Sequence, residues 1–459
     1  MKLMRVFVIL LALGLVAAAC GSSDDTTTTA AQQTTTTAAA EETTTTQPAE
    51  AGMKTGVGVD PDTMTIKLGA LHDLTGPFSP LVIDINDAMQ VYYDTLNANG
   101  GIDGWMIDYQ VLDTAYNVEQ HLEQYEALRN DVLALTASTG TPTSVAALQA
   151  MADDNMTFIP LSWYSGWGIP EFDGGLALEM NTNYCIEAMN LMEFINDNGG
   201  QTVAIAGFPS DYGLDFAAGV KLAADFYGME VVFEGAVIPG QDQTEVITGI
   251  VASGADWTLV AVNAPVLAEL LGGAFAAGYQ GMWTGATPSY NFALLDSPVG
   301  PIIDQVYYQS AYNVVWGDDA PGNVEMMTAM AAAFPDRIPS DAFIIGWNEG
   351  VMMTQVLADA IAAGDLTREG VAAAVNAQSG VDFKGTTPDQ SFTGDPNDYV
   401  TRESAIFDPD LATYLAAGGA EQTLSQEDGT TGSLLAKDFF ASEAAQEFIF
   451  DSPCFSLEG

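Results

Sequence analysis

The sequence predicts an α/β fold made of two doubly wound lobes, each built on a parallel sheet, with a multi-strand hinge between them. Short β-prone runs alternate with helical patterns, and this alternation restarts near the middle of the chain. The part that can fold is about 400 residues long, which is too long for a single core. In open α/β sheets ligands bind beyond the carboxyl ends of the strands, so a ligand is expected in the cleft between the lobes.

The first series of elements follows residue 64. A β-prone run is followed by apolar residues at helical spacing, which stop at Asn99-Gly100-Gly101. Strand and helix then alternate with short Gly-rich connections, a pattern typical of parallel βαβ units. Strands are expected at 64–71, 106–113, 132–137 and 157–163, and helices at 82–97, 118–128 and 143–153.

The same alternation begins again after residue 185. Strands are expected at 202–208, 230–238, 257–262, 282–285 and 306–312, and helices at 186–197, 215–226, 244–252 and 264–277. Two long helices follow at 324–334 and 341–363, and they should return to pack on the first lobe because they are too few to form a third one. Lobe 1 is therefore expected to comprise 60–180 and 313–377, and lobe 2 to comprise 181–312 and 378–459, with a C-terminal extension.

The N-terminus has the pattern of an export signal that ends at Cys20. Lys2 and Arg5 precede an uncharged apolar run at 6–16, which is shorter than the ~20 residues that a membrane-spanning helix needs. Three alanines then lead to Cys20, and this order resembles the lipobox of bacterial lipoproteins. The resemblance implies a signal peptide at 1–19, acylation of Cys20 and an extracytoplasmic protein anchored to the cell membrane. Secretion with an incidental cysteine is the alternative.

Residues 20–59 are rich in threonine and lack aromatic side chains and apolar periodicity. Such a segment has too little apolar surface to offset the entropy of ordering, so it is expected to be a flexible tether.

The charge balance restricts the possible partners, because 61 acidic residues stand against 11 basic ones. Nucleic acid and direct docking on anionic lipid both depend on clustered Lys and Arg, so neither is expected. The excess acid is interpreted as a solvated surface, with attraction of cationic ligands as the alternative. Beyond Cys20 the cysteines are Cys185 and Cys454, which export predicts to form a disulfide; two free thiols are the alternative.

Catalysis and cofactor binding receive little support from the sequence. The two histidines are His72, beside Asp73 at a strand end, and His121, in a charged helix where it is expected at the surface. No serine or cysteine elbow accompanies His72, the ligands for a metal site are missing, and the glycine-rich phosphate-binding motifs are absent. We therefore expect no enzyme, no cofactor and no metal.

Seven segments follow one another in an order and spacing that a known family shares. They are Ile66 to Gly69, Asp73-Leu74-Thr75-Gly76-Pro77, Leu96 to Gly104, Gly140-Thr141-Pro142-Thr143-Ser144, Ile159-Pro160-Leu161-Ser162, Asp211-Tyr212-Gly213 and the helix at 346–363. Together they resemble the type I periplasmic binding proteins of the branched-chain amino acid and amide group, from about residue 64 to residue 409. The resemblance implies a monomer that closes by a hinge motion around a small-molecule solute and presents it to an ABC permease.

Several candidate ligand-binding residues follow the expected strand ends. Thr139, Thr141 and Ser162 offer hydroxyls beside helix N-termini, and in this family the two loops hold the polar end of the ligand. Trp163 and Tyr164 offer aromatic walls, with core packing as the alternative.

On the second lobe, Tyr212 falls where family members place a tyrosine that covers the ligand, with packing at the hinge as the alternative.

The sequence departs from the amino-acid binders of this family in two places. They carry a carboxylate after the strand at 282–285, whereas this chain has Thr287 there, and Asn263 replaces an expected tyrosine. An unpaired buried ammonium costs several kcal/mol, so an α-amino acid is in doubt unless Asp211, Asp215 or Glu349 reaches the site. Amide, urea-like or hydroxylated solutes would need only the hydroxyls, Asn263 and the aromatic walls.

The sequence therefore predicts a solute-binding lipoprotein of an ABC importer for an amino acid, amide or urea-like solute. A ligand-sensing receptor of the same fold and an exported hydrolase that uses His72 are the alternatives.

Overall fold

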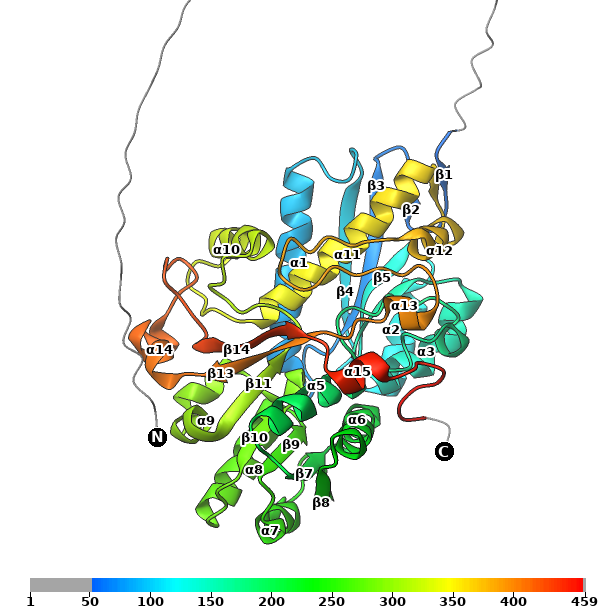
Figure 1. Cartoon of the computed structure of the whole chain (residues 1–459). Coiled ribbons are helices and arrows are strands. Elements are labelled where there is room, and N and C mark those ends of the chain that lie inside the picture. Colours follow the sequence, from blue (N-terminus) through cyan, green and yellow to red (C-terminus); the bar gives the residue numbers. More distant parts are fainter. Residues whose placement is uncertain (1–51, 457–459) are drawn as a thin grey trace, which may run out of the picture. The chain divides into compact units, whose positions relative to one another are not determined.

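The computed structural model in Figure 1 describes residues 52–456. The expected signal peptide, Cys20 and the tether up to residue 51 lie outside the described residues. Within the described part, none of the helices combines the length and the apolarity that crossing a membrane requires.

The first lobe is built on a sheet whose central strand is β3. Its side chains are mostly buried, as expected for a strand covered by helices on both faces. The strands β4, β3, β5 and β6 lie parallel in that order, and the short β2 pairs antiparallel with the start of β3. The bounds are β2 Val59–Asp60, β3 Thr65–His72, β4 Met106–Asp113, β5 Ala134–Thr139 and β6 Phe158–Leu161.

Helices from two distant parts of the chain cover this sheet (Figure 1). The helix α11 packs along α1 so closely that a Cβ added at Gly346 would lie 1.9 Å from the carbonyl oxygen of Ile85. The helices α10 and α11 therefore belong to the first lobe, although in sequence they follow the five parallel strands of the second lobe. The bounds are α1 Ser79–Ala98, α2 Val118–Leu128, α3 Thr141–Asp153, α10 Pro321–Ala333, α11 Ala342–Ala363 and α12 Arg368–Ala377.

The second lobe has a seven-stranded sheet of order β14-β13-β11-β10-β9-β7-β8. The five strands from β8 to β11 are parallel, whereas β13 and β14 add an antiparallel edge that the sequence analysis did not predict. The bounds are β7 Thr202–Gly207, β8 Glu230–Ala236, β9 Trp257–Ala261, β10 Met282–Gly285, β11 Tyr307–Ala311, β13 Ser404–Pro409 and β14 Ser433–Phe440.

The helices α5 and α6 pack against each other on this lobe. A Cβ added at Gly219 of α6 would lie 2.2 Å from the carbonyl oxygen of Cys185 in α5, so the contact depends on that glycine. A disulfide joins Cys185 to Cys454, the pairing expected from the sequence, and it fixes the C-terminal segment to α5. The main helices are α5 Tyr184–Asp197, α6 Asp211–Tyr227, α7 Thr244–Ser253, α8 Ala264–Ala276 and α9 Gly300–Val306, and the shorter ones are α14 Leu411–Ala416 and α15 Glu443–Glu447.

Three segments of the described chain run between the lobes, at 162–183, 312–320 and 378–403. The first contains α4 (Pro170–Asp173) and the third contains α13 (Pro396–Tyr399). Hydrogen bonds tie these two segments together, because the Asn181 amide donates to Gln390 Oε1 at 3.1 Å and Thr387 Oγ1 donates to Asn181 Oδ1 at 3.1 Å.

The folded part begins earlier than the expected tether boundary at residue 59. The strand β1 (Lys54–Thr55) pairs with β12 (Asp365–Leu366), and β2 joins the first sheet. Gly58 has φ +77° and approaches the main chain of Leu133 so closely that a Cβ would lie 2.2 Å from its nitrogen. Composition did not reveal this boundary because the pairing uses main-chain groups.

Candidate functional site

A small cavity lies between the two lobes, and we call it the cleft cavity. Its volume is about 30 Å³, so the lobes nearly touch here and only water-sized space remains. A solute larger than water would fit here only with the lobes further apart. The lining side chains are Phe78, Leu81, Val82, Tyr116, Thr139, Thr141, Leu161, Ser162 and Trp163 from the first lobe, and Tyr184, Asp211, Tyr212 and Pro288 from the second.

Two neighbouring strand ends place the predicted hydroxyls in this cavity. The strand β5 ends at Thr139, Gly140 turns the chain with φ +90°, and α3 begins at Thr141. A Cβ at Gly140 would lie 2.4 Å from the ring of Tyr116, which lines the same cavity. Ser162 follows the adjacent parallel strand β6, so its side chain comes to the same edge of the sheet.

The three hydroxyls differ in whether they already form hydrogen bonds within the protein. Thr139 Oγ1 lies 3.2 Å from His72 Nδ1, and Ser162 Oγ accepts a hydrogen bond of 3.0 Å from the indole of Trp167. Thr141 Oγ1 is buried and forms no hydrogen bond of regular geometry, although it lies near enough to the Asp211 carboxyl to lower the pKa of that group. Thr141 is therefore the hydroxyl most available to a solute.

Asp211 supplies the negative charge of the cleft cavity. It is the first residue of α6 and only 6 % of it is exposed. Burial raises the pKa of its carboxyl to about 6, and the hydrogen-bond donors around it, including Thr141, act in the opposite direction. No Lys or Arg lines the cavity within the described chain, so the carboxylate faces space without a counter-ion. From the sequence, Asp211 was one of three acids that could pair with a ligand ammonium if they reached the site.

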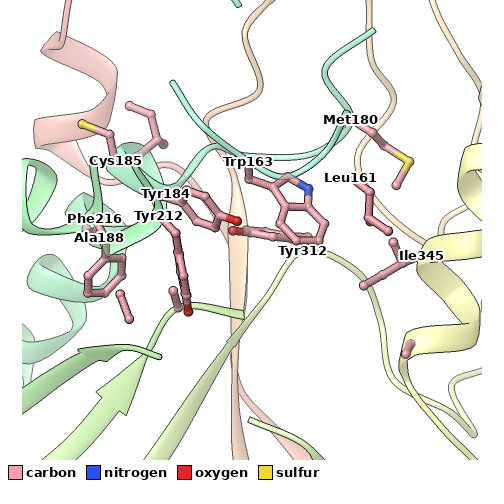
Figure 2. Close-up of a cluster of buried hydrophobic side chains, with 14 of the residues drawn as sticks. Leu161, Trp163, Met180, Tyr184, Cys185, Ala188, Tyr212, Phe216, Tyr312 and Ile345 are labelled. Carbon is pink, nitrogen blue, oxygen red and sulfur yellow. The ribbon is translucent and has the colours of Figure 1, made fainter. Parts of the chain in front are cut away.

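Aromatic rings form most of the remaining wall. Figure 2 shows Trp163, Tyr184, Tyr212 and Tyr312 gathered between the lobes. The rings of Trp163 and Tyr312 are 5.0 Å apart, and those of Tyr184 and Tyr212 are 4.6 Å apart. The indole nitrogen of Trp163 is buried without a hydrogen-bond partner. Trp163 thus lies where the sequence analysis expected an aromatic wall.

The hydroxyl of Tyr212 faces its own lobe. It donates to the carbonyl oxygen of Val262 at 3.0 Å and lies 3.0 Å from Ser289 Oγ. Only the ring faces the cleft cavity, so a ligand-covering role for Tyr212 is limited to ring contact.

Tyr164 does not line the cleft cavity. Its ring packs in a separate core with Trp167 and Phe172, and its hydroxyl donates to the carbonyl oxygen of Phe455 at 2.6 Å. Successive side chains of an extended segment point to opposite sides, so Trp163 faces the cleft while Tyr164 faces the C-terminal segment. The expected second aromatic wall is therefore absent from this cavity.

Asn263 also lies outside the cleft cavity. It caps α8, where its side-chain oxygen accepts from the Val266 amide at 3.3 Å. Its amide nitrogen donates to the carbonyl oxygen of Pro77 at 3.3 Å, which is a direct hydrogen bond between the lobes.

Thr287 binds a buried carboxylate of the protein itself. Its amide and its hydroxyl donate to Glu187 Oε1 at 2.8 and 2.6 Å. Glu187 lies on α5 and is completely buried, and burial raises its pKa to about 7. An acid therefore does lie beside the end of β10, but it comes from a helix about a hundred residues earlier. The signal in the sequence is a Glu in the first turn of a helix whose neighbouring residues are mostly apolar.

The other two acids named as possible partners of an ammonium, Asp215 and Glu349, lie outside the cleft cavity. Asp215 accepts from the amide and hydroxyl of Ser165 at 3.0 and 2.6 Å, and Glu349 is buried on α11 of the first lobe.

Both histidines are buried, so the surface position predicted for His121 is wrong. His121 lies on the inner face of α2, 3.3 Å from Ser138 Oγ, and burial lowers its pKa to about 4. His72 is held between Thr139 and Tyr109, and burial lowers its pKa to about 3. No grouping of three or more His, Cys, Asp or Glu side chains able to hold a metal occurs among residues 52–456.

Comparisons with known proteins agree with this architecture. Residues 65–407 match the family model described as periplasmic binding protein. The chain is similar to a fatty acid ABC transporter substrate-binding protein from Thermomonospora curvata, with 27% identity, 86% of this chain and 97% of the other covered, and a TM-score of 0.76. No curated protein sequence matches the chain.

Two further similar structures have lower identity and show the fold alone. One is a branched chain amino acid ABC transporter protein from Thermus thermophilus with bound valine, with 17% identity, 85% and 99% coverage, and a TM-score of 0.69. The other is an ABC transporter substrate-binding protein from Aeropyrum pernix, with 16% identity, 84% and 99% coverage, and a TM-score of 0.68. These likenesses confirm the predicted fold of two parallel-sheet lobes.

Proposed function

This chain belongs to the periplasmic binding protein family, whose members are non-catalytic solute-binding proteins of ABC transporters, and we propose that it captures a small amphipathic solute in the cleft cavity. It acts outside the cytoplasm as the substrate-binding component of a transporter.

The main support for this proposal is that Asp211 and Thr141, which lie on opposite lobes, line the same cavity. The Asp211 carboxylate can accept hydrogen bonds from an ammonium or an amide NH₂ group. Thr141 Oγ1 and the free amides at the start of α3 can donate to a carboxylate or carbonyl oxygen, which the helix dipole favours. Because each lobe contributes one half of this arrangement, a solute that bears both groups favours a form in which the two lobes contact it from opposite sides.

The aromatic walls favour a solute whose remaining part is apolar. Phe78, Trp163 and Tyr184 surround the cavity with apolar surface, which stabilises an apolar body by its removal from water. An apolar amino acid or a primary amide combines such a body with the required polar end. The position of Asp211 in the cavity supports an ammonium-bearing solute although no acid follows β10 in sequence.

A fatty acid is the second candidate, favoured by the Thermomonospora curvata protein and by the apolar walls. Its carboxylate would lie near the Asp211 carboxylate, and two like charges repel unless one is protonated. Because the pKa of Asp211 is raised to about 6, a fatty acid should bind better below that pH, whereas an ammonium solute should bind better above it.

Calorimetry on solute-free protein at about pH 5 and about pH 8 separates the two candidates. The probes are leucine and phenylalanine, their amides, and decanoate. We expect the amino acids or amides to bind and their affinity to rise with pH, and we expect Asp211→Asn to remove that rise. Tight binding of decanoate that strengthens at low pH would support the second candidate.

We also propose that Cys20 is lipidated and that the segment up to residue 51 tethers the lobes to the cell membrane. The support is the order of charged, apolar and small residues before Cys20 in the sequence.

A monomer that delivers the solute to a permease fits this arrangement. No observation favours the receptor alternative over it.

A further inference from the structure

A second cavity, separate from the cleft cavity, lies in the hinge, and we call it the hinge cavity. Its volume is about 200 Å³, which exceeds the roughly 150 Å³ that is enough to admit a benzene ring. Its walls come from the two connecting segments at 162–183 and 378–403 and from the end of α12. The lining side chains include two acids, Asp173 and Glu179, and three aromatic rings, those of Trp167, Phe392 and Tyr399.

Glu179 is the unusual group in this wall. Only 7 % of it is exposed, and its Oε1 is buried without a hydrogen-bond partner. Its Oε2 lies against Gly168, where an added Cβ would be 3.0 Å away. A buried carboxylate without hydrogen-bond or charge partners is costly in free energy. A cation or a hydrogen-bond donor in the cavity would stabilise it.

The neighbouring charged groups do not stabilise the Glu179 carboxylate. Asp173 lines the same cavity, but its oxygens accept from the amides of Gly175 and Ala177 at 2.7 and 3.1 Å. The charges that act on Glu179 come from Asp173 and Asp215, both acidic, and they add to burial in raising its pKa well above the ordinary value. None of the ion pairs formed within residues 52–456 includes Glu179.

We propose that the hinge cavity binds a small organic ammonium ion, with Glu179 as its counter-ion and the rings of Trp167, Phe392 and Tyr399 around its apolar part. One carboxylate and aromatic faces are enough to hold such a cation. A divalent metal ion fits the site less well, because it needs several oxygen ligands and Asp173 is already used by main-chain amides. The exposed residues Pro170, Gly174 and Asn376 leave the cavity an opening to solvent.

Calorimetry with benzylammonium tests this site, and benzyl alcohol is the neutral probe of matched shape. We expect benzylammonium to bind the full chain at least about tenfold more tightly than benzyl alcohol, because only the cation adds the attraction of an opposite charge to its hydrogen bond with the carboxylate. Glu179→Gln should weaken benzylammonium binding by about tenfold or more and leave benzyl alcohol unchanged.

Two control variants locate the effect. Glu171→Gln removes an exposed acid from the same segment and should bind benzylammonium like the parent. Asp211→Asn alters the cleft cavity and should also bind like the parent, so this test stands apart from the proposed solute function.

Equal binding of the two probes, or tight binding that Glu179→Gln leaves intact, would overturn the proposal, and the cavity would then hold water or apolar molecules only. Loss of binding in Asp211→Asn would place the cation in the cleft instead. Should Glu179→Gln fail to fold, the comparison of the two probes on the parent chain still decides the matter.

Discussion

The hydroxyl of Tyr312 donates a hydrogen bond of 2.6 Å to Oε2 of Glu187, which is completely buried on α5. Thr287 occupies the other carboxyl oxygen. The ring of Tyr312 lies 5.0 Å from that of Trp163, a wall of the cleft cavity. The buried carboxyl thus joins helix α5 to the residues that follow β10 and β11, and one of these, Tyr312, packs against Trp163 of the cleft cavity.

This arrangement predicts a pH dependence of stability. Burial raises the pKa of Glu187 from 4.5 to about 7 in the folded protein. Such a carboxyl stabilises the fold below the unfolded pKa, and this contribution is lost as the pH rises through about 7. We expect Glu187→Gln to reduce the fall in unfolding free energy between about pH 5 and about pH 8 by ~1–3 kcal/mol. Urea unfolding at the two pH values measures it.

Glu245→Gln is the control for this experiment, because Glu245 is exposed in the first turn of α7. Its slope should match that of the parent. An unchanged slope in Glu187→Gln would show that the carboxyl is not responsible.

The disulfide between Cys185 and Cys454 should stabilise the second lobe. Replacing both cysteines by alanine frees the C-terminal segment, and a disulfide of this kind typically contributes ~2–4 kcal/mol to the unfolding free energy. Denaturant unfolding of the parent and the double variant gives the value. Reducing agent should shift the parent toward the double variant and leave the double variant unchanged; two free thiols in exported parent protein would contradict the pairing.

Tyr212→Phe separates stability from binding. The hydroxyl bonds within its own lobe to Val262 and Ser289, so its removal should lower the unfolding free energy by ~1 kcal/mol. Solute affinity should change by less than about twofold, because only the ring faces the cavity. An affinity loss of tenfold with unchanged stability would mean that the hydroxyl reaches the solute.

The lipid anchor is tested by Cys20→Ser in the expressed full chain. Serine is not acylated, so the variant should move from the membrane pellet to the soluble fraction when cells are fractionated. Ser22→Ala, two residues further on, is the matched control and should still pellet. A Cys20→Ser protein that stays with the membrane would rule out this anchor.

Much of the fold follows from local sequence patterns. The expected elements at 106–113, 118–128 and 282–285 have the same bounds as β4, α2 and β10, because apolar periodicity is strong there. The edge strands β13 and β14 were missed. The exposed Leu434 and Leu435 of β14 give that strand no clean alternation, and its place depends on a partner about 30 residues earlier in sequence.

The site was predictable only in part. Thr141 and Trp163 lie in the cleft cavity because they directly follow strand ends, which sequence patterns locate well. The orientation of Tyr164 depends on Phe455, and that of Thr287 depends on Glu187, both far away in sequence. A single sequence does not encode such distant pairings in any local pattern, so these two residues were assigned to the site on their position alone.

A solute held from both lobes in the cleft cavity should lose affinity when either side of the cavity is altered. Calorimetry measures this with whichever of leucine, phenylalanine or their amides binds the parent, on the parent, Trp163→Ala and Asp211→Asn, with Glu245→Gln as control. Both cavity variants should lose ~1–3 kcal/mol, roughly tenfold to a hundredfold in affinity, and the control should lose none, with all variants folded. Parent-like affinity in both folded cavity variants would rule out this site and place the solute elsewhere.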